Sequence, residues 1–216
     1  LEETAELVRG AGGTCHVQTM DVTQREATHK SLQGAVEAMG GLDGLINNAG
    51  LGGPNACGDD GPDRWDGILR TNLDGLYFCT EAAVPLLPDG GRVIHISSVL
   101  GKFGVPGYTG YCTSKHGVIG FTKALAMELA PRKITVNAIC PGWVETVMAQ
   151  DGFDAMAEGM GVTPEEARKQ ALSEVPLGAF LSGGVDSSYL ADVAHEVLGA
   201  RMHVVLGRIA TLRDRR

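Results

Sequence analysis

Two residues in one short segment, Tyr111 and Lys115, have the types and the spacing for acid–base chemistry. They begin and end the sequence YCTSK, so in a helix their side chains share one face. A free tyrosine has a pKa of about 10, which is too high for proton exchange near neutral pH. A nearby ammonium group favours the phenolate, so we predict that Lys115 lowers the pKa of Tyr111. Ser98, thirteen positions earlier, could donate a hydrogen bond to a carbonyl oxygen. Together the three residues are suited to protonating an alkoxide as a hydride arrives, whereas a Y-x-x-x-K pair alone is more often a surface pair on a helix.

Four apolar segments alternate with amphipathic segments and predict a parallel sheet. The predicted strands are residues 15–22, 42–50, 91–98 and 134–142, and the predicted helices are residues 23–41, 64–87, 111–130 and 148–174. Near-continuous apolar strands of this kind lie in sheets with helices on both faces. We therefore predict an α/β fold with a Rossmann-like, doubly wound parallel sheet, in which Thr23 caps the helix after the first strand.

Unusual polar and turn residues fall where these strands end. In such sheets ligands bind outside the carboxyl ends of the strands. The residues at those ends are Asp21, Asn48, Ser98, Pro141 and Gly142. Taken singly, Asp21 could be a helix N-terminal residue, Asn48 a turn residue and Asn72 an ordinary polar residue. Their joint order along the chain favours one shared site.

The composition is that of a globular protein, with 44% hydrophobic and 20% charged residues among 216. The net charge of −8 argues against a nucleic-acid partner, because neutralising phosphates requires clustered Lys and Arg. No apolar run reaches the ~18 residues of a membrane span, so we expect no membrane partner. The five cysteines never form C-x-x-C, which predicts no metal site and fits a reducing cytoplasm.

The motifs MDVT, NNAG, TNL, ISS, YCTSK and NAICPGWVET occur in the order typical of short-chain dehydrogenases/reductases, and the sequence resembles that family over residues 1–178. The resemblance implies a catalytic tetrad of Asn72, Ser98, Tyr111 and Lys115. Tyr111 would be the acid in reduction and the base in oxidation, Lys115 would hold the nicotinamide ribose, and Asn72 would anchor a proton-relay water. The residues implied for an NADP or NAD cofactor are Asp21 and Val22 at the adenine, Asn48, Ala49 and Gly50 on the adenosine side, Tyr111 and Lys115, and Pro141, Gly142, Val144 and Thr146 at the nicotinamide.

Within the family, the sequence is most similar to 3-oxoacyl and polyketide ketoreductases and to 3-hydroxybutyrate-type dehydrogenases. This implies interconversion of a ketone and a secondary alcohol on a small acyl-like substrate. It also implies a substrate lid formed by residues 147–174 and a homo-oligomer.

The sequence departs from the family pattern near its beginning. The T-G-x-x-x-G-x-G loop that cradles the cofactor pyrophosphate is not present. The glycine-rich residues 8–14 follow a predicted helix and precede a strand, which is the wrong order for a dinucleotide fingerprint. We therefore expect an N-terminally truncated domain with weak or no dinucleotide binding, in which the choice between NAD and NADP cannot be read.

A second departure occupies residues 179–216, where AFLSGGVDSSYLADVAHEVLG resembles the start of an ATP-pyrophosphatase (PP-loop) domain. A strand, a tight turn and a helix N-terminus form a phosphate cradle. The implied loop is Ser182, Gly183, Gly184, Asp186, Ser187 and Ser188. The alternatives are an ATP-binding adenylating protein, an inactive chimeric fragment, or a segment in which residues 185–198 and 202–206 simply replace the last helix and strand of the reductase.

Overall fold

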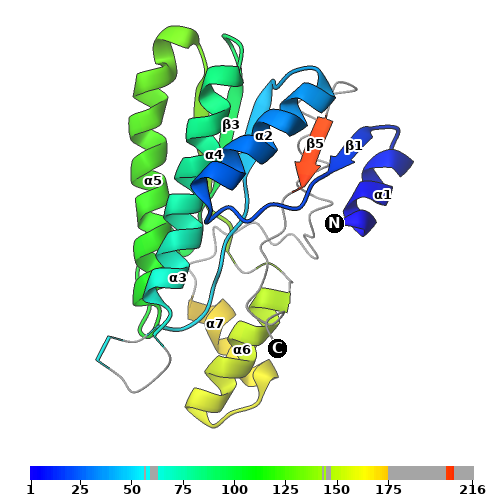
Figure 1. Cartoon of the computed structure of the whole chain (residues 1–216). Coiled ribbons are helices and arrows are strands. Elements are labelled where there is room, and N and C mark those ends of the chain that lie inside the picture. Colours follow the sequence, from blue (N-terminus) through cyan, green and yellow to red (C-terminus); the bar gives the residue numbers. More distant parts are fainter. Residues whose placement is uncertain (56, 59–62, 143, 145–146, 175–202, 207–216) are drawn as a thin grey trace.

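The computed structural model describes residues 1–55, 57–58, 63–142, 144, 147–174 and 203–206. Its strands are all parallel. Strands β2 (Gly44–Asn47), β3 (Arg92–Ile96) and β4 (Thr135–Ile139) form a three-stranded sheet in the order β2-β3-β4. Strand β1 (Thr14–Val17) pairs with β5 (His203–Leu206), which lies inside the predicted strand at residues 202–206. Figure 1 shows β5 beside β1. The α/β class and the parallel sheet are confirmed.

The register aligns the carboxyl ends of the three central strands. Asn47 of β2 pairs with His95 of β3, and His95 pairs with Ala138 of β4. Ser97 N then donates to Ile139 O at 2.8 Å, so the chain leaving β3 stays against β4. The residues that follow these strands therefore meet at one edge of the sheet.

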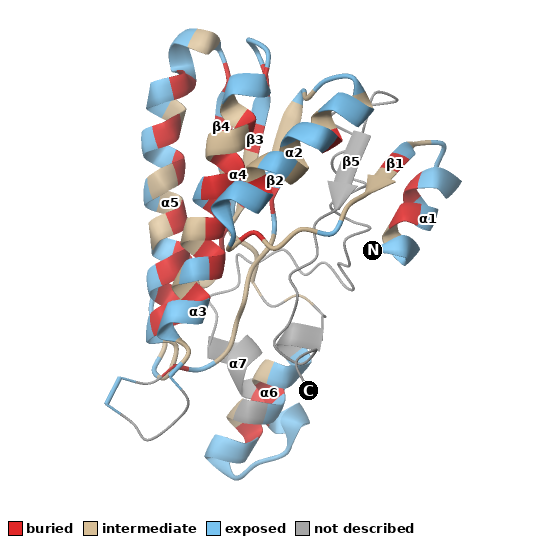
Figure 2. Ribbon diagram, viewed as in Figure 1, coloured by how far each residue is buried: buried red, intermediate tan, exposed pale blue. Residues whose placement is uncertain are grey.

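Helices cover the strands through apolar contacts. Helices α2 (Arg25–Met39), α4 (Leu76–Ala83) and α5 (Thr109–Leu129) lie side by side in front of the three-stranded sheet (Figure 1), and α4 and α5 pack on its strands. Buried positions recur along α5 between exposed ones (Figure 2). The largest buried cluster joins the strands to the ends of α4 and α5 and comprises Leu87, Val93, Leu125, Leu129, Ile134 and Val136. Helix α1 (Glu2–Gly10) packs on β1 through Ala5 and Val8.

The predicted helix over residues 64–87 is helical throughout but not uniform. It consists of α3 (Trp65–Leu69), a π-helical segment η1 (Arg70–Gly75), α4 and a final 3-10 turn η2 (Val84–Leu86). The wide turns of η1 contain Asn72, which is 1% exposed. Such π-segments are rare and are frequent at functional sites.

The prediction that Thr23 caps α2 is wrong. The N-cap position of α2 is Gln24, and the carboxylate of Asp21 accepts hydrogen bonds from Thr23 N (2.9 Å) and from the Thr23 hydroxyl (2.8 Å). Asp21 therefore organises this turn, since a short carboxylate reaches the backbone two residues on more readily than a hydroxyl does. The predicted helix stop is confirmed, because Gly40 adopts the left-handed conformation with φ of 79°.

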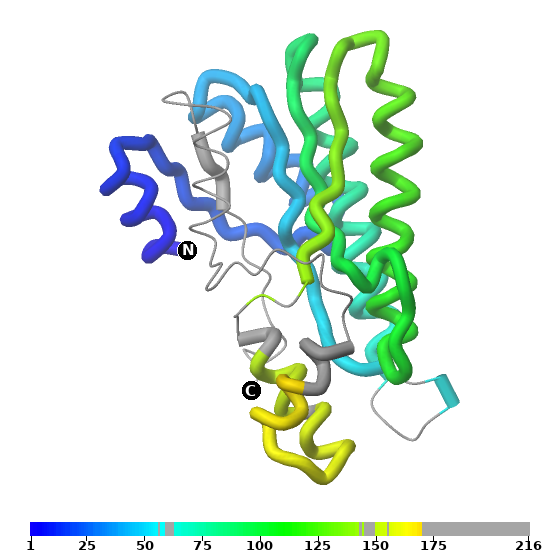
Figure 3. Tube along the Cα trace, turned by 180° about the vertical axis from the view of Figure 1, so that it is seen from behind, coloured from blue at the N-terminus to red at the C-terminus, as the bar shows by residue number. Residues whose placement is uncertain are grey.

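The predicted helix over residues 148–174 divides into α6 (Val147–Met160) and α7 (Pro164–Glu174). Thr163 and Glu166 form a reciprocal capping box before α7: Thr163 N donates to Glu166 Oε2 at 2.9 Å and Glu166 N donates to Thr163 Oγ1 at 3.3 Å. Helices α6 and α7 pack on each other and lie below the sheet in the view of Figure 1, and Figure 3 shows them from behind. In the described residues no helix is both long and apolar enough to cross a bilayer.

Candidate active site

The site is built on the segment that leaves β3. Ser98 is the first residue before the 3-10 turn η3 (Val99–Gly101), and its Oγ accepts a hydrogen bond from Leu100 N at 3.1 Å. Val99 N donates to Pro141 O at 2.9 Å, which fixes the segment after β3 against the segment after β4. Two of the predicted positions, Ser98 and Pro141, are thereby brought together by backbone pairing.

Tyr111 lies in the first turn of α5, with its phenol near the side chain of Ser98. Burial raises the pKa of the Tyr111 phenol above its ordinary value, and the neighbouring Ser98 opposes that rise only in part. The phenol therefore stays protonated at neutral pH. A protonated hydroxyl beside a serine hydroxyl can donate a hydrogen bond, and then a proton, to an oxygen placed between them.

Lys115 is buried, with 6% of its surface exposed. Its Nζ donates to Ile96 O at 2.9 Å and lies 5.6 Å from the centre of the Tyr111 ring. Burial lowers the pKa of Lys115 to about 8, and the nearby Cys140 opposes this by favouring the charged form. The Lys115 ammonium is thus held near the tyrosine ring and has two further N–H donors besides the one bonded to Ile96 O.

The prediction that Lys115 lowers the pKa of Tyr111 is wrong for this structure. The ammonium faces the ring and bonds to the backbone of β3, and burial is the largest influence on the phenol. Sequence spacing correctly placed the two side chains on one helical face but carried no information on their desolvation.

Asn72 joins three parts of the fold through its side-chain amide. Its Oδ1 accepts from Leu51 N at 2.7 Å, and its Nδ2 donates to Leu51 O and to Ser114 Oγ, each at 2.9 Å. Both N–H groups of the amide are therefore used within the protein. A methyl group at Gly50 would lie 3.3 Å from Asn72 Oδ1 and 3.5 Å from Lys115 Nζ. The segment after β2 thus runs directly past Asn72 and Lys115, and the predicted tetrad gathers in one place.

Three polar residues that the sequence reasoning passed over support this arrangement. Ser114 bonds Asn72, and Ser97 Oγ donates to Lys115 O at 2.9 Å. Asn47 Nδ2 donates to Thr80 Oγ1 at 2.8 Å, fixing the end of β2 to α4. The available signal was adjacency to a residue already chosen, since Asn47 precedes Asn48, Ser97 precedes Ser98 and Ser114 precedes Lys115.

The remaining predicted positions are placed less completely. Asp21 is half-buried and its carboxylate is bonded to Thr23, while Val22 is buried against Gly75 of η1. Pro141, Gly142 and Val144 are half-buried after β4. Thr146 and the loop residues Ser182, Gly183, Gly184, Asp186, Ser187 and Ser188 lie outside the described residues.

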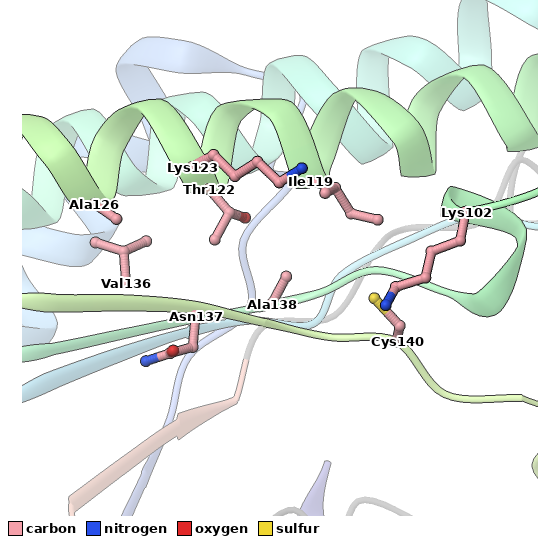
Figure 4. Close-up of a pocket in the computed structure, with 9 residues that line it drawn as sticks. All are labelled: Lys102, Ile119, Thr122, Lys123, Ala126, Val136, Asn137, Ala138 and Cys140. Atoms are coloured by element: carbon pink, nitrogen blue, oxygen red, sulfur yellow. The ribbon is translucent and has the colours of Figure 1, made fainter. Parts of the chain in front are cut away.

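A cavity of about 300 Å³ lies between α5 and β4 (Figure 4). Lys102, Lys123, Thr122 and Cys140 are among the residues that line it, but none of the predicted tetrad is. The cavity therefore does not coincide with the Ser98–Tyr111 hydroxyl pair.

Two family models match the chain. A model described as short chain dehydrogenase matches residues 1–157, and one described as asparagine synthase matches residues 165–209. The first covers most of the chain and all of the predicted tetrad, and the second covers the predicted PP-loop.

Curated relatives and solved structures agree with the first match. The chain is 36% identical over 182 residues to 3-oxoacyl-acyl-carrier-protein reductase FabG of Thermotoga maritima, covering 83% of this chain and 70% of the relative. It is 34% identical over 197 residues to D-beta-hydroxybutyrate dehydrogenase of Cupriavidus necator, covering 88% and 76%. A crystal structure of a variant actinorhodin polyketide ketoreductase with NADPH superposes with a TM-score of 0.78 at 34% identity, covering 99% of this chain and 84% of that one.

Proposed function

We propose that this chain, which belongs to the short-chain dehydrogenase family, interconverts a ketone and a secondary alcohol at Tyr111 with a nicotinamide dinucleotide as the hydride carrier. The observation that carries the proposal is the proximity of the Ser98 and Tyr111 side chains beyond the carboxyl end of β3, with the Lys115 ammonium 5.6 Å from the centre of the tyrosine ring. A proton donor, an oxygen clamp and a buried cation in one place are what the reduction of a carbonyl requires.

The residues present fit the ribose and nicotinamide of the cofactor, whereas the sequence holds no T-G-x-x-x-G-x-G loop for its pyrophosphate, so we expect weak binding. Lys115 has three N–H donors, of which one bonds Ile96 O, so the others can bind ribose hydroxyls. Because Gly50 has no side chain, the backbone at residue 50 can pass close to Asn72 and Lys115. Asp21 and Val22 would contact the adenine, Asn48, Ala49 and Gly50 the adenosine side, and Pro141, Gly142, Val144 and Thr146 the nicotinamide. When bound in its reduced form, the cofactor supplies the hydride.

The chain's own residues handle the oxygen and the proton. Ser98 Oγ and the Tyr111 hydroxyl orient the carbonyl oxygen, and Tyr111 donates its proton to that oxygen as it becomes an alkoxide. Burial raises the pKa of Tyr111, which favours the donor form needed for reduction. Below pH about 8 Lys115 is charged, and its ammonium group can donate hydrogen bonds to the ribose of the cofactor. Because both Asn72 N–H groups are occupied, we place the anchor for a proton-relay water on the Asn72 backbone carbonyl in η1.

We propose a 3-oxoacyl thioester or a similar 3-oxo compound as the substrate. The names of the FabG and hydroxybutyrate dehydrogenase relatives refer to such acyl compounds, and helices α6 and α7 lie where a lid over the strand ends would lie. Homo-oligomerisation is also proposed, supported by apolar side chains exposed on the long helices, above all Met127 of α5 at 80% exposure. Light scattering during size-exclusion chromatography tests that assembly.

The test of function is a steady-state assay of cofactor oxidation with NADPH and with NADH. The substrate panel pairs acetoacetyl thioesters with a sugar ketone and a plain cyclic ketone. We expect turnover of the thioesters and a loss of at least about 100-fold in kcat for Tyr111→Phe, because removal of a general acid typically costs 10²–10⁴-fold. Turnover by Tyr111→Phe equal to that of the unmodified chain would remove Tyr111 from the proposal.

The asparagine synthase match supports a second interpretation for the C-terminal residues only. We propose a reductase part at residues 1–178 and a PP-loop-like segment at residues 179–216. The β1–β5 ladder links the two parts, because β5 lies in the second and β1 in the first. If the loop adenylates a substrate with ATP, exchange of pyrophosphate into ATP should be measurable and should vanish in Asp186→Ala.

A further inference from the structure

Three buried hydroxyls on the helices share one bonding pattern. Thr80 Oγ1 donates to Leu76 O and accepts from Asn47 Nδ2, and Ser114 Oγ donates to Tyr111 O at 2.8 Å and accepts from Asn72 Nδ2 at 2.9 Å. Thr122 Oγ1 donates to Val118 O at 2.7 Å and lies 2.9 Å from His95 Nδ1. In each case a hydroxyl bonds both its own helix and a buried polar side chain from another element.

Only the Ser114 pattern leads into the candidate active site. Ser114 is completely buried and directly precedes Lys115, while its partner Asn72 bonds both backbone groups of Leu51. Leu51 follows Gly50, which approaches both Asn72 and Lys115. A chain of hydrogen bonds therefore runs from the backbone of Tyr111 through Ser114 and Asn72 to the segment after β2.

The direction of each bond follows from the donors. Leu51 N can only donate, so Asn72 must present Oδ1 to it, and Nδ2 then donates to Leu51 O and to Ser114 Oγ. The Ser114 hydroxyl donates its single hydrogen to Tyr111 O, so it can only accept a hydrogen bond from Asn72 Nδ2. With Ser114 absent, one N–H of a nearly buried amide loses its partner, and only the two bonds to Leu51 still orient the amide.

We propose that Ser114 is a positioning residue that fixes the amide of Asn72 and, through it, holds the segment at residues 48–51 against the catalytic helix. Ser114 touches neither substrate nor cofactor in this account. Its effect on catalysis rests on the proposed function, in which Asn48, Ala49 and Gly50 lie along the adenosine side of the cofactor.

The test compares Ser114→Ala with the matched variant Thr122→Ala. Both remove a buried hydroxyl from α5, and both leave a buried polar partner short of one bond, but only Ser114 contacts Asn72. The first readout is hydrogen exchange of the Leu51 amide, which needs no cofactor. We expect exchange to be about tenfold faster in Ser114→Ala and to change less than twofold in Thr122→Ala. In the background of Asn72→Ala, the Ser114 change should add nothing.

The second readout is kinetic. Ser114→Ala should raise the KM for the cofactor about tenfold while kcat changes less than threefold. Ser114→Cys keeps a weak acceptor and should recover part of the change in exchange and in KM. If the alanine variant does not fold, the cysteine variant is measured in its place. Unchanged Leu51 exchange in Ser114→Ala, or an equal rise in Thr122→Ala, overturns the proposal. If the unmodified chain reduces no ketone, the proposed function fails, and the exchange result still decides the role of Ser114.

Discussion

Gly75→Ala should destabilise the protein, although alanine is normally the better residue in a helix. A methyl group at Gly75 would lie 2.7 Å from Val22 Cγ2, 3.1 Å from Val22 Cβ and 3.2 Å from Val22 O. Because two of these atoms are close to or part of the backbone, the π-helical segment or the turn at Val22 must move. Overpacking of this kind costs ~1–3 kcal/mol, and the gain in helix propensity is ~1 kcal/mol, so we expect a net loss of up to ~2 kcal/mol.

Gly120→Ala is the matched control for this change. Gly120 is exposed in the middle of α5, and nothing lies within 4 Å of a methyl group placed there. The substitution should stabilise the protein by ~0.5–1 kcal/mol. Urea unfolding followed by circular dichroism measures both variants. If Gly75→Ala unfolds at the same urea concentration as Gly120→Ala, the close packing of η1 on Val22 is refuted. By the proposed contact of Val22 with the adenine, only Gly75→Ala should also raise the KM for the cofactor.

Three further predictions concern burial and pairing. Burial lowers the pKa of His95 to about 4 from an ordinary 6.5, so between these pH values the unfolded chain binds a proton at His95 that the folded chain does not bind. Stability should therefore fall by about 2 kcal/mol between pH 6.5 and 5, and urea titrations of His95→Gln should show a flatter profile; an equal slope would contradict the assignment. Lys115, with its pKa lowered to about 8 from 10.5, should make the protein more stable as pH rises from 8 to 10.5, and Lys115→Met should abolish that rise. Loss of the Lys115 charge should also reduce the ketone-reducing rate above pH about 8. A rate that does not change between pH 7 and 9.5 would contradict a role for charged Lys115. A chain ending at Glu174 loses the β1–β5 ladder, so the amides of Thr14–Val17 should exchange faster than in the full chain, and unchanged protection would mean that β5 does not support β1.

The sequence could predict which residues come together at the site, because their placement depends on the hydrophobic periodicity and on the order of the strands and helices. Apolar runs located the strands within a few residues, and parallel strands place their carboxyl ends at one edge. Ser98, Asn48 and Pro141 follow from that rule alone. Tyr111 and Lys115 follow from helical spacing, since positions four apart share a face.

What the sequence did not predict depends on contacts between elements. The π-helical segment that contains Asn72 depends on the approach of Gly75 to Val22 and on the bonds from Asn72 to Leu51 and Ser114. None of these contacts is visible in a local pattern. The pKa direction of Tyr111 was missed for the same reason, because desolvation is a property of the folded surroundings. The capping residue before α2 was misassigned because Thr23 is a good capping type, whereas in the structure its hydroxyl bonds Asp21 and the N-cap position falls one residue later, at Gln24.

The most direct test of the account is a label-transfer experiment with a nicotinamide cofactor that carries deuterium at both C4 positions of the reduced ring. The chain is incubated with this cofactor and an acetoacetyl thioester, and the alcohol product is analysed by mass spectrometry. The account predicts an alcohol that carries one deuterium on its carbinol carbon, formed by the unmodified chain and lost in Tyr111→Phe. Alcohol without deuterium, or no alcohol from the unmodified chain at any cofactor concentration, would contradict hydride transfer at this site.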